Sequence, residues 1–121
     1  MTKLDFDKMQ GLIPAVLQNA DSGEVLMLGF MNPAALAETL RNGYATFFSR
    51  TRNRLWTKGE TSGNRAQVIS ISTDCDRDTL LLRVRILGDG LICHRGTRSC
   101  FTEGVFTESL PRSPEFSGAT E

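Results

Sequence analysis

The sequence lacks the features that would place it in a membrane, outside the cell or on a polyanion. Its longest apolar stretch, residues 25–31, is far too short to cross a bilayer. The first ten residues contain no apolar core of a signal peptide. Fourteen lysines and arginines balance fourteen aspartates and glutamates, so no global field favours nucleic acid or a charged membrane surface. We therefore expect a cytoplasmic protein with no membrane and no nucleic-acid partner.

Cysteine and histidine are also scarce. The chain has three cysteines and one histidine in 121 residues. An odd number of cysteines fits poorly with a closed set of disulfides, and free thiols fit a reducing compartment. All four residues fall between positions 75 and 100, although the chain is long enough for only one domain. This concentration indicates a reaction centre or a metal site in that segment.

The apolar residues follow the pattern of short strands, so we expect a mainly β (α+β) fold. Residues 12–19 and 24–31 flank an Asp-Ser-Gly turn, which is typical of a β-hairpin. Alternation and apolar runs predict four further strands, at residues 46–48, 55–56, 68–72 and 80–87. After the last of these, Gly88-Asp89-Gly90 indicates a turn that closes another hairpin.

One helix is expected between residues 32 and 43. Asn32 and Pro33 supply an N-cap and a first-turn proline, and Gly43 a C-terminal stop. Its apolar face is predicted from three residues: Leu36, Ala37 and Leu40.

The whole pattern predicts a compact twisted sheet or pseudobarrel with one or two short helices. We expect this domain to span residues 1–101. The remaining residues, 102–121, are polar and include two prolines, so we expect a poorly ordered tail there.

The cysteines have the spacing C-x17-C-x6-C, formed by Cys75, Cys93 and Cys100. Zinc at catalytic centres commonly has three protein ligands and a fourth position for water or substrate. With His94 as a fourth ligand, the cluster would instead be a closed structural site. Cysteines are also often plain buried apolar residues, so spacing alone leaves metal binding and burial both open.

The expected second hairpin adds a geometric argument. It places Cys93 opposite about residue 85, which leaves Cys75 on the order of 30 Å away along the strand. Thiols on one zinc lie much closer, because Zn–S bonds are roughly 2.3 Å long. Either the strand bends sharply, or Cys75 reaches the Cys93/Cys100 pair of another subunit. We expect the second arrangement, a zinc site shared across a homodimer.

Asp74, Asp76 and Asp78 alternate around Cys75, which places their carboxylates on one side of an extended segment. Three carboxylates on one face repel each other unless a cation joins them. Magnesium is commonly held by a few carboxylates together with waters and substrate phosphates. A solvated acidic turn is the alternative, and the adjacent Cys75 favours the metal.

Residues 49–65 combine alternating arginines with a glycine-flanked, hydroxyl-rich loop, K-G-E-T-S-G at 58–63. Guanidinium groups match phosphate oxygens in a bidentate way, and glycines let backbone approach a ligand. A solvated strand face, with the tryptophan in the core, is the alternative. The candidate substrate contacts are Arg50, Arg52, Arg54, Trp56, Lys58, Glu60 and Ser62.

Taken together, four segments resemble the phosphoribosyl-AMP cyclohydrolase family of histidine biosynthesis. They are GEVLMLGFMN (23–32), FFSRTRNRLWTKGETSGN (47–64), DCDRDTLL (74–81) and CHRGTRSCF (93–101). Arg95 stands where threonine is frequent in that family. The resemblance implies a cytoplasmic homodimer with zinc ligands from both subunits. It also implies zinc on Cys75, Cys93 and Cys100, and magnesium on Asp74, Asp76 and Asp78.

The resemblance further implies hydrolysis of the N1–C6 bond of the adenine ring of phosphoribosyl-AMP. Zinc with three thiolate ligands is formally anionic, so water bound to it should be less acidic than at a histidine-ligated zinc. A base is therefore needed to take a proton from this water. His94 is the one histidine that could serve, and a supporting role beside Cys93 is its alternative. Some relatives carry a fused phosphoribosyl-ATP pyrophosphohydrolase domain, for which about twenty residues are too few. We therefore expect the cyclohydrolase step alone.

The same residues bear on two other classes of function. A zinc nucleobase deaminase would require an H-x-E…P-C-x-x-C signature, which is absent. A non-enzymatic, zinc-stabilised β module that binds a partner or RNA remains as the alternative. Such a module predicts a closed four-ligand site and no need for the aspartates.

Overall fold

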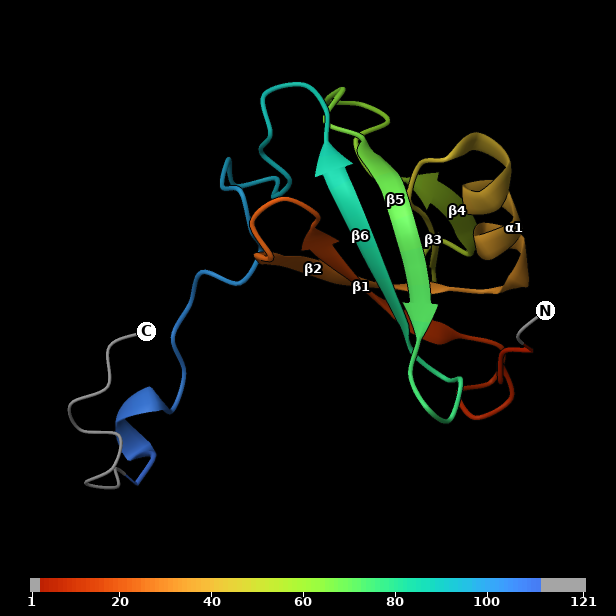
Figure 1. The fold of residues 1–121 in the computed structure, drawn as a ribbon, viewed down its shortest axis with the longest axis horizontal. Helices are drawn as coiled ribbons and strands as arrows, with labels where there is room; N and C mark the ends of the chain where they lie inside the picture. The colour runs from red at the N-terminus through yellow and green to blue at the C-terminus, as the bar shows by residue number, and fades with distance from the viewer. Residues whose placement is uncertain (1–2, 112–121) are drawn as a thin grey trace.

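The computed structural model of the chain describes residues 3–111, and its main body consists of two β-sheets with one α-helix beside them (Figure 1). The elements in chain order are β1 Ile13–Asn19, β2 Val25–Met31, α1 Pro33–Asn42, β3 Thr46–Ser49, β4 Arg54–Thr57, β5 Ala66–Thr73, β6 Leu80–Ile86 and a short 3-10 helix, Thr107–Ser109. The mainly β fold is thus confirmed, and each predicted strand is present within a few residues of its expected bounds. Within the described chain, no helix is long and apolar enough to cross a bilayer.

The larger sheet has the strand order β2-β1-β6-β5. β1 and β2 form the expected antiparallel hairpin, with Ile13 opposite Met31. β6 pairs in parallel with β1 on one side and antiparallel with β5 on the other. Both edges of β6 are therefore occupied.

The prediction of a second hairpin closed by Gly88-Asp89-Gly90 is wrong, because β6 already has a partner on each side. The turn exists, but the chain that follows it cannot pair with β6 and does not return along it. It crosses instead to the start of β2, where the Ser99 hydroxyl donates to the Val25 carbonyl at 2.8 Å. The Cys100 N–H donates to the Leu26 carbonyl, also at 2.8 Å.

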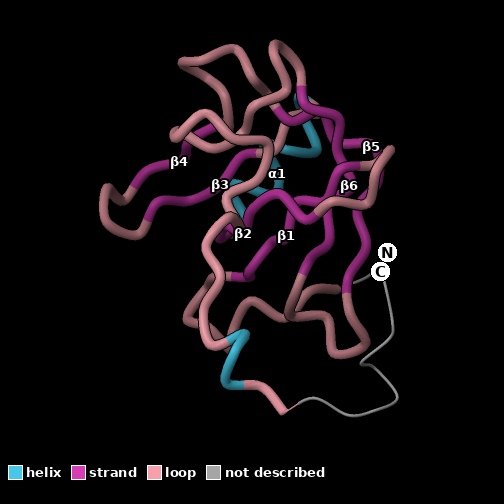
Figure 2. The backbone as a smooth tube through the Cα atoms, turned by 90° about the vertical axis from the view of Figure 1, so that its left-hand side faces the viewer, coloured by secondary structure: helices cyan, strands magenta, loops and turns pink. Residues whose placement is uncertain are grey.

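The smaller sheet is the antiparallel β3–β4 hairpin, which projects beside the larger sheet (Figure 2). Phe47 of β3 is fully buried, and its ring centroid lies 5.0 Å from that of Trp56 on β4. A Cβ added at Gly29 of β2 would lie 2.5 Å from the Phe47 ring. The two sheets therefore meet at a glycine, because only glycine leaves room for this ring.

Helix α1 has the predicted ends. The Asn32 side chain accepts a hydrogen bond from the Ala35 N–H at 2.8 Å, and Gly43 ends the helix with a φ of 82°. The predicted apolar face is right at Leu36, which packs against the core, and wrong at Ala37 and Leu40, which are exposed. The fully buried residues of the helix are Ala35 and Thr39. Burial of Thr39 is possible because its hydroxyl donates to the Ala35 carbonyl and accepts from the Thr46 N–H.

The chain after Cys100 leaves the sheets and runs outward as an exposed segment (Figure 1). Residues 102–111 belong to the tail expected from the sequence, and they are exposed throughout. The rest of that tail, residues 112–121, lies outside the described residues. The division at residue 101 remains a prediction.

Candidate functional site

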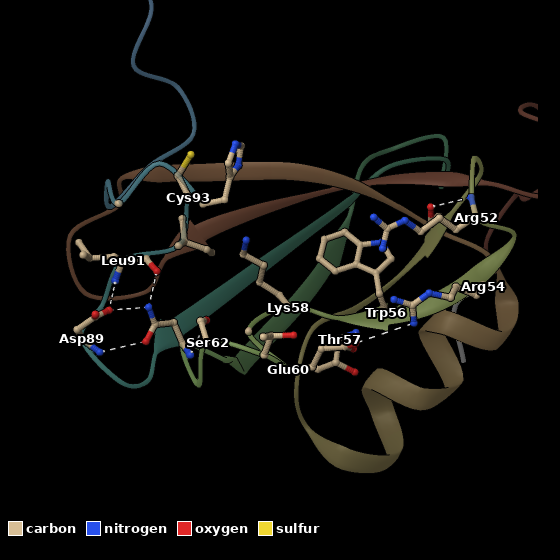
Figure 3. A pocket seen from close by; sticks show the side chains of 17 residues that line it. Arg52, Arg54, Trp56, Thr57, Lys58, Glu60, Ser62, Asp89, Leu91 and Cys93 are labelled. Carbon is tan, nitrogen blue, oxygen red and sulfur yellow. Dashed lines mark hydrogen bonds and ion pairs between the residues drawn. The ribbon is translucent and has the colours of Figure 1, made fainter.

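A cavity of about 610 Å³ opens between the β3–β4 hairpin, the loop that joins β4 to β5, and the segment after β6 (Figure 3). Six of the seven candidate substrate contacts line it: Arg52, Arg54, Trp56, Lys58, Glu60 and Ser62. Cys93 and His94 line it from the segment after β6. The structure thus gathers residues that are about forty positions apart in the sequence around one space.

Strand β4 and the loop after it supply one wall of this cavity. Arg54, Trp56 and Lys58 alternate along the chain, so a strand directs them to the same side. The sequence left Trp56 as either a core residue or a substrate contact. In the structure its ring packs on Phe47 and it also lines the cavity, so it combines both positions. Glu60 fixes the loop, since its carboxylate accepts from the Thr57 N–H at 2.7 Å and lies 3.9 Å from the Arg54 guanidinium.

Arg50 is the candidate that the structure does not place in this cavity wall. Its guanidinium carbon lies 4.5 Å above the centre of the Phe30 ring on β2. This is a cation–π contact, in which the ring face attracts the positive charge. The alternating arginines are therefore divided between the cavity and the body of the protein.

The segment after β6 is shaped by backbone hydrogen bonds around Cys93. The Cys93 N–H donates to the Thr97 carbonyl at 3.0 Å, and the Gly96 N–H donates to the Cys93 carbonyl at 2.9 Å. Gly96 has a φ of 81°, which favours glycine in this tight turn. The turn brings Cys100 back toward Cys93, so that each thiol affects the pKa of the other.

The two thiols differ in acidity. The Arg95 backbone N–H, donating to the sulfur, lowers the pKa of Cys93 below its usual value. Partial desolvation, followed by the interaction with the Cys93 thiol, raises the pKa of Cys100. The pKa values of the two thiols are therefore shifted in opposite directions.

Cys75 lies away from this pair in the same chain. It is exposed in the turn between β5 and β6, whereas Cys93 and Cys100 follow the opposite end of β6 (Figure 1). Because β6 has seven residues, its two ends are about 23 Å apart. The structure therefore brings two of the three predicted zinc ligands together and leaves the third remote.

The three aspartates do come together. One carboxylate oxygen from each of Asp74, Asp76 and Asp78 lies within 4.8 Å of the other two. The segment is not extended as expected, because the Asp74 carboxylate accepts from the N–H groups of Asp78 at 3.1 Å and Thr79 at 3.3 Å and so closes a turn. Oxygen atoms gathered in this way could hold a metal ion.

Lys8 is a member of this acidic site that the sequence did not reveal. Its ammonium lies 3.2 Å from a carboxylate oxygen of Asp76 and 3.2 Å from one of Asp78. Hydrogen bonds to Asp78 and then Asp76 raise the pKa of Lys8, and the bond to Lys8 lowers the pKa of Asp78. At Asp76 the bond to Lys8 is the largest effect and lowers the pKa, but the neighbouring carboxyls of Asp78 and Asp74 reverse it, and the pKa is raised overall.

Asn64 and Asp89 are two further residues that sequence reasoning missed in the cavity wall. The Asn64 side-chain amide donates to the Asp89 carboxylate at 2.5 Å. The Gly-Asp-Gly at 88–90 predicts a turn, and the acidic side chain between its two glycines is the signal of a second role. Asn64 is the last residue of the segment 47–64, but its partner is 25 positions away, so the sequence does not indicate the contact.

Comparison with known families shows which family this chain belongs to. The model of the phosphoribosyl-AMP cyclohydrolase family matches residues 27–102, which include the cavity walls, the acidic turn and all three cysteines. The chain belongs to the phosphoribosyl-AMP cyclohydrolase family. This confirms the resemblance found in the four sequence segments.

Curated relatives of this cyclohydrolase domain carry the name "histidine biosynthesis bifunctional protein HisIE". Those from Escherichia coli and Salmonella typhimurium are 60% and 59% identical over 99 residues, which cover 82% of this chain and 48% of each relative. The relative from Shewanella oneidensis is 56% identical over 103 residues, or 85% of this chain and 48% of its own length. The chain thus spans about half the length of the curated relatives it matches.

Proposed function

We propose that this chain hydrolyses the N1–C6 bond of the adenine ring of phosphoribosyl-AMP, a step of histidine biosynthesis that yields the formimino-aminoimidazole carboxamide ribotide. The observation that carries the proposal is the cavity itself. It places a thiol and the only histidine on one wall and three cationic side chains on the other, in a chain of the cyclohydrolase family. Its volume of about 610 Å³ is in the range that small-molecule sites occupy.

Two metals belong to the proposal, and the donor sets fit them. Thiolates suit zinc, and a group of carboxylates suits magnesium. Zinc would be held by Cys93 and Cys100 of one chain and by Cys75 of a second copy, since Cys75 lies at the other end of β6 from the pair. Cys75 is exposed and can therefore reach another chain. A homodimer built in this way would also bring the adjacent aspartates, with magnesium, toward the cavity.

Zinc, when bound, would supply a water molecule of lowered pKa. We propose that His94, beside Cys93 on the cavity wall, takes a proton from the attacking water as the water oxygen bonds to C6. The bond between C6 and N1 then breaks, and the imidazolium of His94 returns the proton to N1. The balance is one water added: one proton ends on N1, the hydroxyl proton moves to the exocyclic nitrogen on C6, and the oxygen becomes the carboxamide oxygen, so no ammonia is released.

The opposite wall would hold the two phosphates and the ring. Arg52 and Arg54 offer guanidinium forks that match phosphate oxygens, and Lys58 adds a point charge. The Lys58 ammonium also acts on Cys100, where it opposes the rise of the thiol pKa. Trp56 offers an aromatic face to the adenine, and its contact with Phe47 keeps that face fixed.

The identity of the product tests this function. Purified chain would be incubated with phosphoribosyl-AMP, and the product followed by mass spectrometry together with an ammonia assay. Ring opening adds the mass of one water and releases no ammonia, whereas deamination at C6 releases ammonia. A folded, zinc-loaded protein that forms neither product would contradict the proposal and favour the non-enzymatic β module.

A further inference from the structure

Asn64 joins the two walls of the cavity. Its Nδ2 donates to the Asp89 carboxylate at 2.5 Å and to the Leu91 carbonyl at 2.7 Å. Its Oδ1 accepts from the Asp89 N–H at 3.2 Å. The Asp89 carboxylate in turn accepts from the Leu91 N–H at 3.2 Å, as the dashed lines at Asp89 and Leu91 show in Figure 3. Asn64 itself is only 9% exposed.

Two glycines make this junction possible. A Cβ at Gly88 would collide with the side-chain oxygen of Asn64, and a Cβ at Gly59 would collide with the backbone carbonyl of Asn64. Both glycines have positive φ, 74° at Gly88 and 80° at Gly59. Each loop therefore has a glycine where it approaches Asn64, which permits hydrogen bonding at close range.

The junction matters because the segment after β6 has no strand to hold it. Residues 91–100 do not pair with the sheet as a strand, so loop contacts and the buried side chain of Ile92 fix their position. One end is held at β2 through Ser99 and Cys100. The other end is held at Leu91 through Asn64, two residues before Cys93 and three before His94.

We propose that Asn64 is a positioning residue of the cyclohydrolase reaction, which sets the distance between the wall of Cys93 and His94 and the basic wall of β4. The proposal rests on the proposed function. If Asn64 were only a structural residue, its hydrogen bonds would contribute to the stability of the fold and not to the rate. A positioning residue also controls the rate of the chemical step, because a displacement of about 1 Å can cost on the order of a hundredfold in rate.

The test begins with Asn64→Asp, which keeps the size of the side chain and an oxygen that accepts from the Asp89 N–H. It loses both donated hydrogen bonds and places one carboxylate against another. We expect kcat to fall by about 10-fold to 100-fold, with kcat/KM falling in parallel, since the loss affects the transition state and not ground-state binding.

The reversed pair, Asn64→Asp with Asp89→Asn, restores one donor and one acceptor between the two positions. We expect it to recover part of the lost kcat, at least about threefold over Asn64→Asp, while the Leu91 carbonyl stays without its donor. Asp89→Asn alone is measured to complete the cycle. If Asn64→Asp does not fold, the same assay is carried out with the uncharged variant Asn64→Ser. The serine hydroxyl is too short to reach both Asp89 and Leu91.

Asn19→Ala is the matched control. The Asn19 side chain also holds a turn, since it accepts from the N–H groups of Asp21 at 2.8 Å and Ser22 at 3.0 Å, but this turn joins β1 to β2 and does not line the cavity. We expect this variant to lose stability in urea and to keep wild-type kcat.

A second readout is independent of turnover. Amide hydrogen exchange at Asp89 and Leu91 should accelerate in Asn64→Asp and stay unchanged in Asn19→Ala. Wild-type kcat in Asn64→Asp, or a loss of kcat that the reversed pair does not repair, would overturn the inference, as would unchanged exchange at Leu91. Absence of turnover in the wild type would contradict the proposed function instead, and the exchange experiment would still test the junction.

Discussion

Two single residues, His94 and Lys8, have proposed roles that substitution can test directly. His94 is the only histidine of the chain and lines the cavity next to Cys93. Lys8 lies between two carboxylates of the acidic turn. One belongs to the cavity and the other to the turn at the far end of β6, so their substitutions test different parts of the proposal.

His94→Ala tests the assignment of the base. Removal of a general base typically lowers the rate by about 10²-fold to 10⁴-fold, and we expect a loss of kcat in this range with the circular dichroism spectrum unchanged. Steady-state assays across the pH range are the measurement. Near-normal kcat at every pH would show that His94 is not the base.

Lys8→Met tests whether Lys8 competes with a metal ion at the acidic turn. An ammonium close to a divalent cation repels it, so we expect the affinity for Mg²⁺ to rise about fivefold at low salt. Isothermal titration calorimetry measures it. Arg85→Met, which removes the same charge from a pair with Asp21 elsewhere, is the control. Equal affinities in Lys8→Met and wild type would contradict the competition.

At the scale of residues, the sequence indicates candidate site residues where they form local motifs. The D-C-D-R-D run and the cysteines after β6 are recognised from spacing, and the basic residues of the cavity from their alternation. Lys8 and Asn64 could not be found in this way. Lys8 is 68 positions from Asp76 and Asn64 is 25 from Asp89, so only the folded chain brings these pairs together.

At the scale of elements, the strands and the helix were predictable because each has its own alternation, cap or turn. The partners of β6 were not. Its parallel pairing with β1 depends on contacts between positions more than sixty residues apart, and this pairing excludes the hairpin expected after Gly90. The separation of Cys75 from Cys93 that was expected from this hairpin is nevertheless present, since the two cysteines lie at opposite ends of β6.

Gly29→Ala tests the contact between the two sheets. The added Cβ would lie 2.5 Å from the Phe47 ring, which cannot withdraw without disturbing Trp56. Overpacking of this kind costs about 1–3 kcal/mol, and we expect that loss in the free energy of unfolding measured in urea. Gly104→Ala is the control, because its nearest neighbour would be 3.9 Å away. Equal stability of Gly29→Ala and wild type would show that the sheets adjust without cost.

At the scale of the whole molecule, the open point is how Cys75 reaches the other two cysteines. One chain brings Cys93 and Cys100 together and leaves Cys75 exposed elsewhere, so a three-thiolate site requires a second copy. Cys75→Ser and Cys93→Ser should each be inactive alone. After mixing and refolding they should regain about a quarter of wild-type activity, because about half of the dimers are mixed and each has one complete site of two. Mixtures that stay inactive would contradict a site shared between chains.

The most direct test of the central claim is turnover of phosphoribosyl-AMP, followed by ultraviolet absorbance, in protein that has been stripped of zinc and then reloaded. The account predicts turnover in the native protein, its loss on chelation and its return when zinc is added back. Undiminished turnover in zinc-free protein would contradict the thiol site, and absence of turnover in the reloaded, folded protein would contradict the cyclohydrolase function itself.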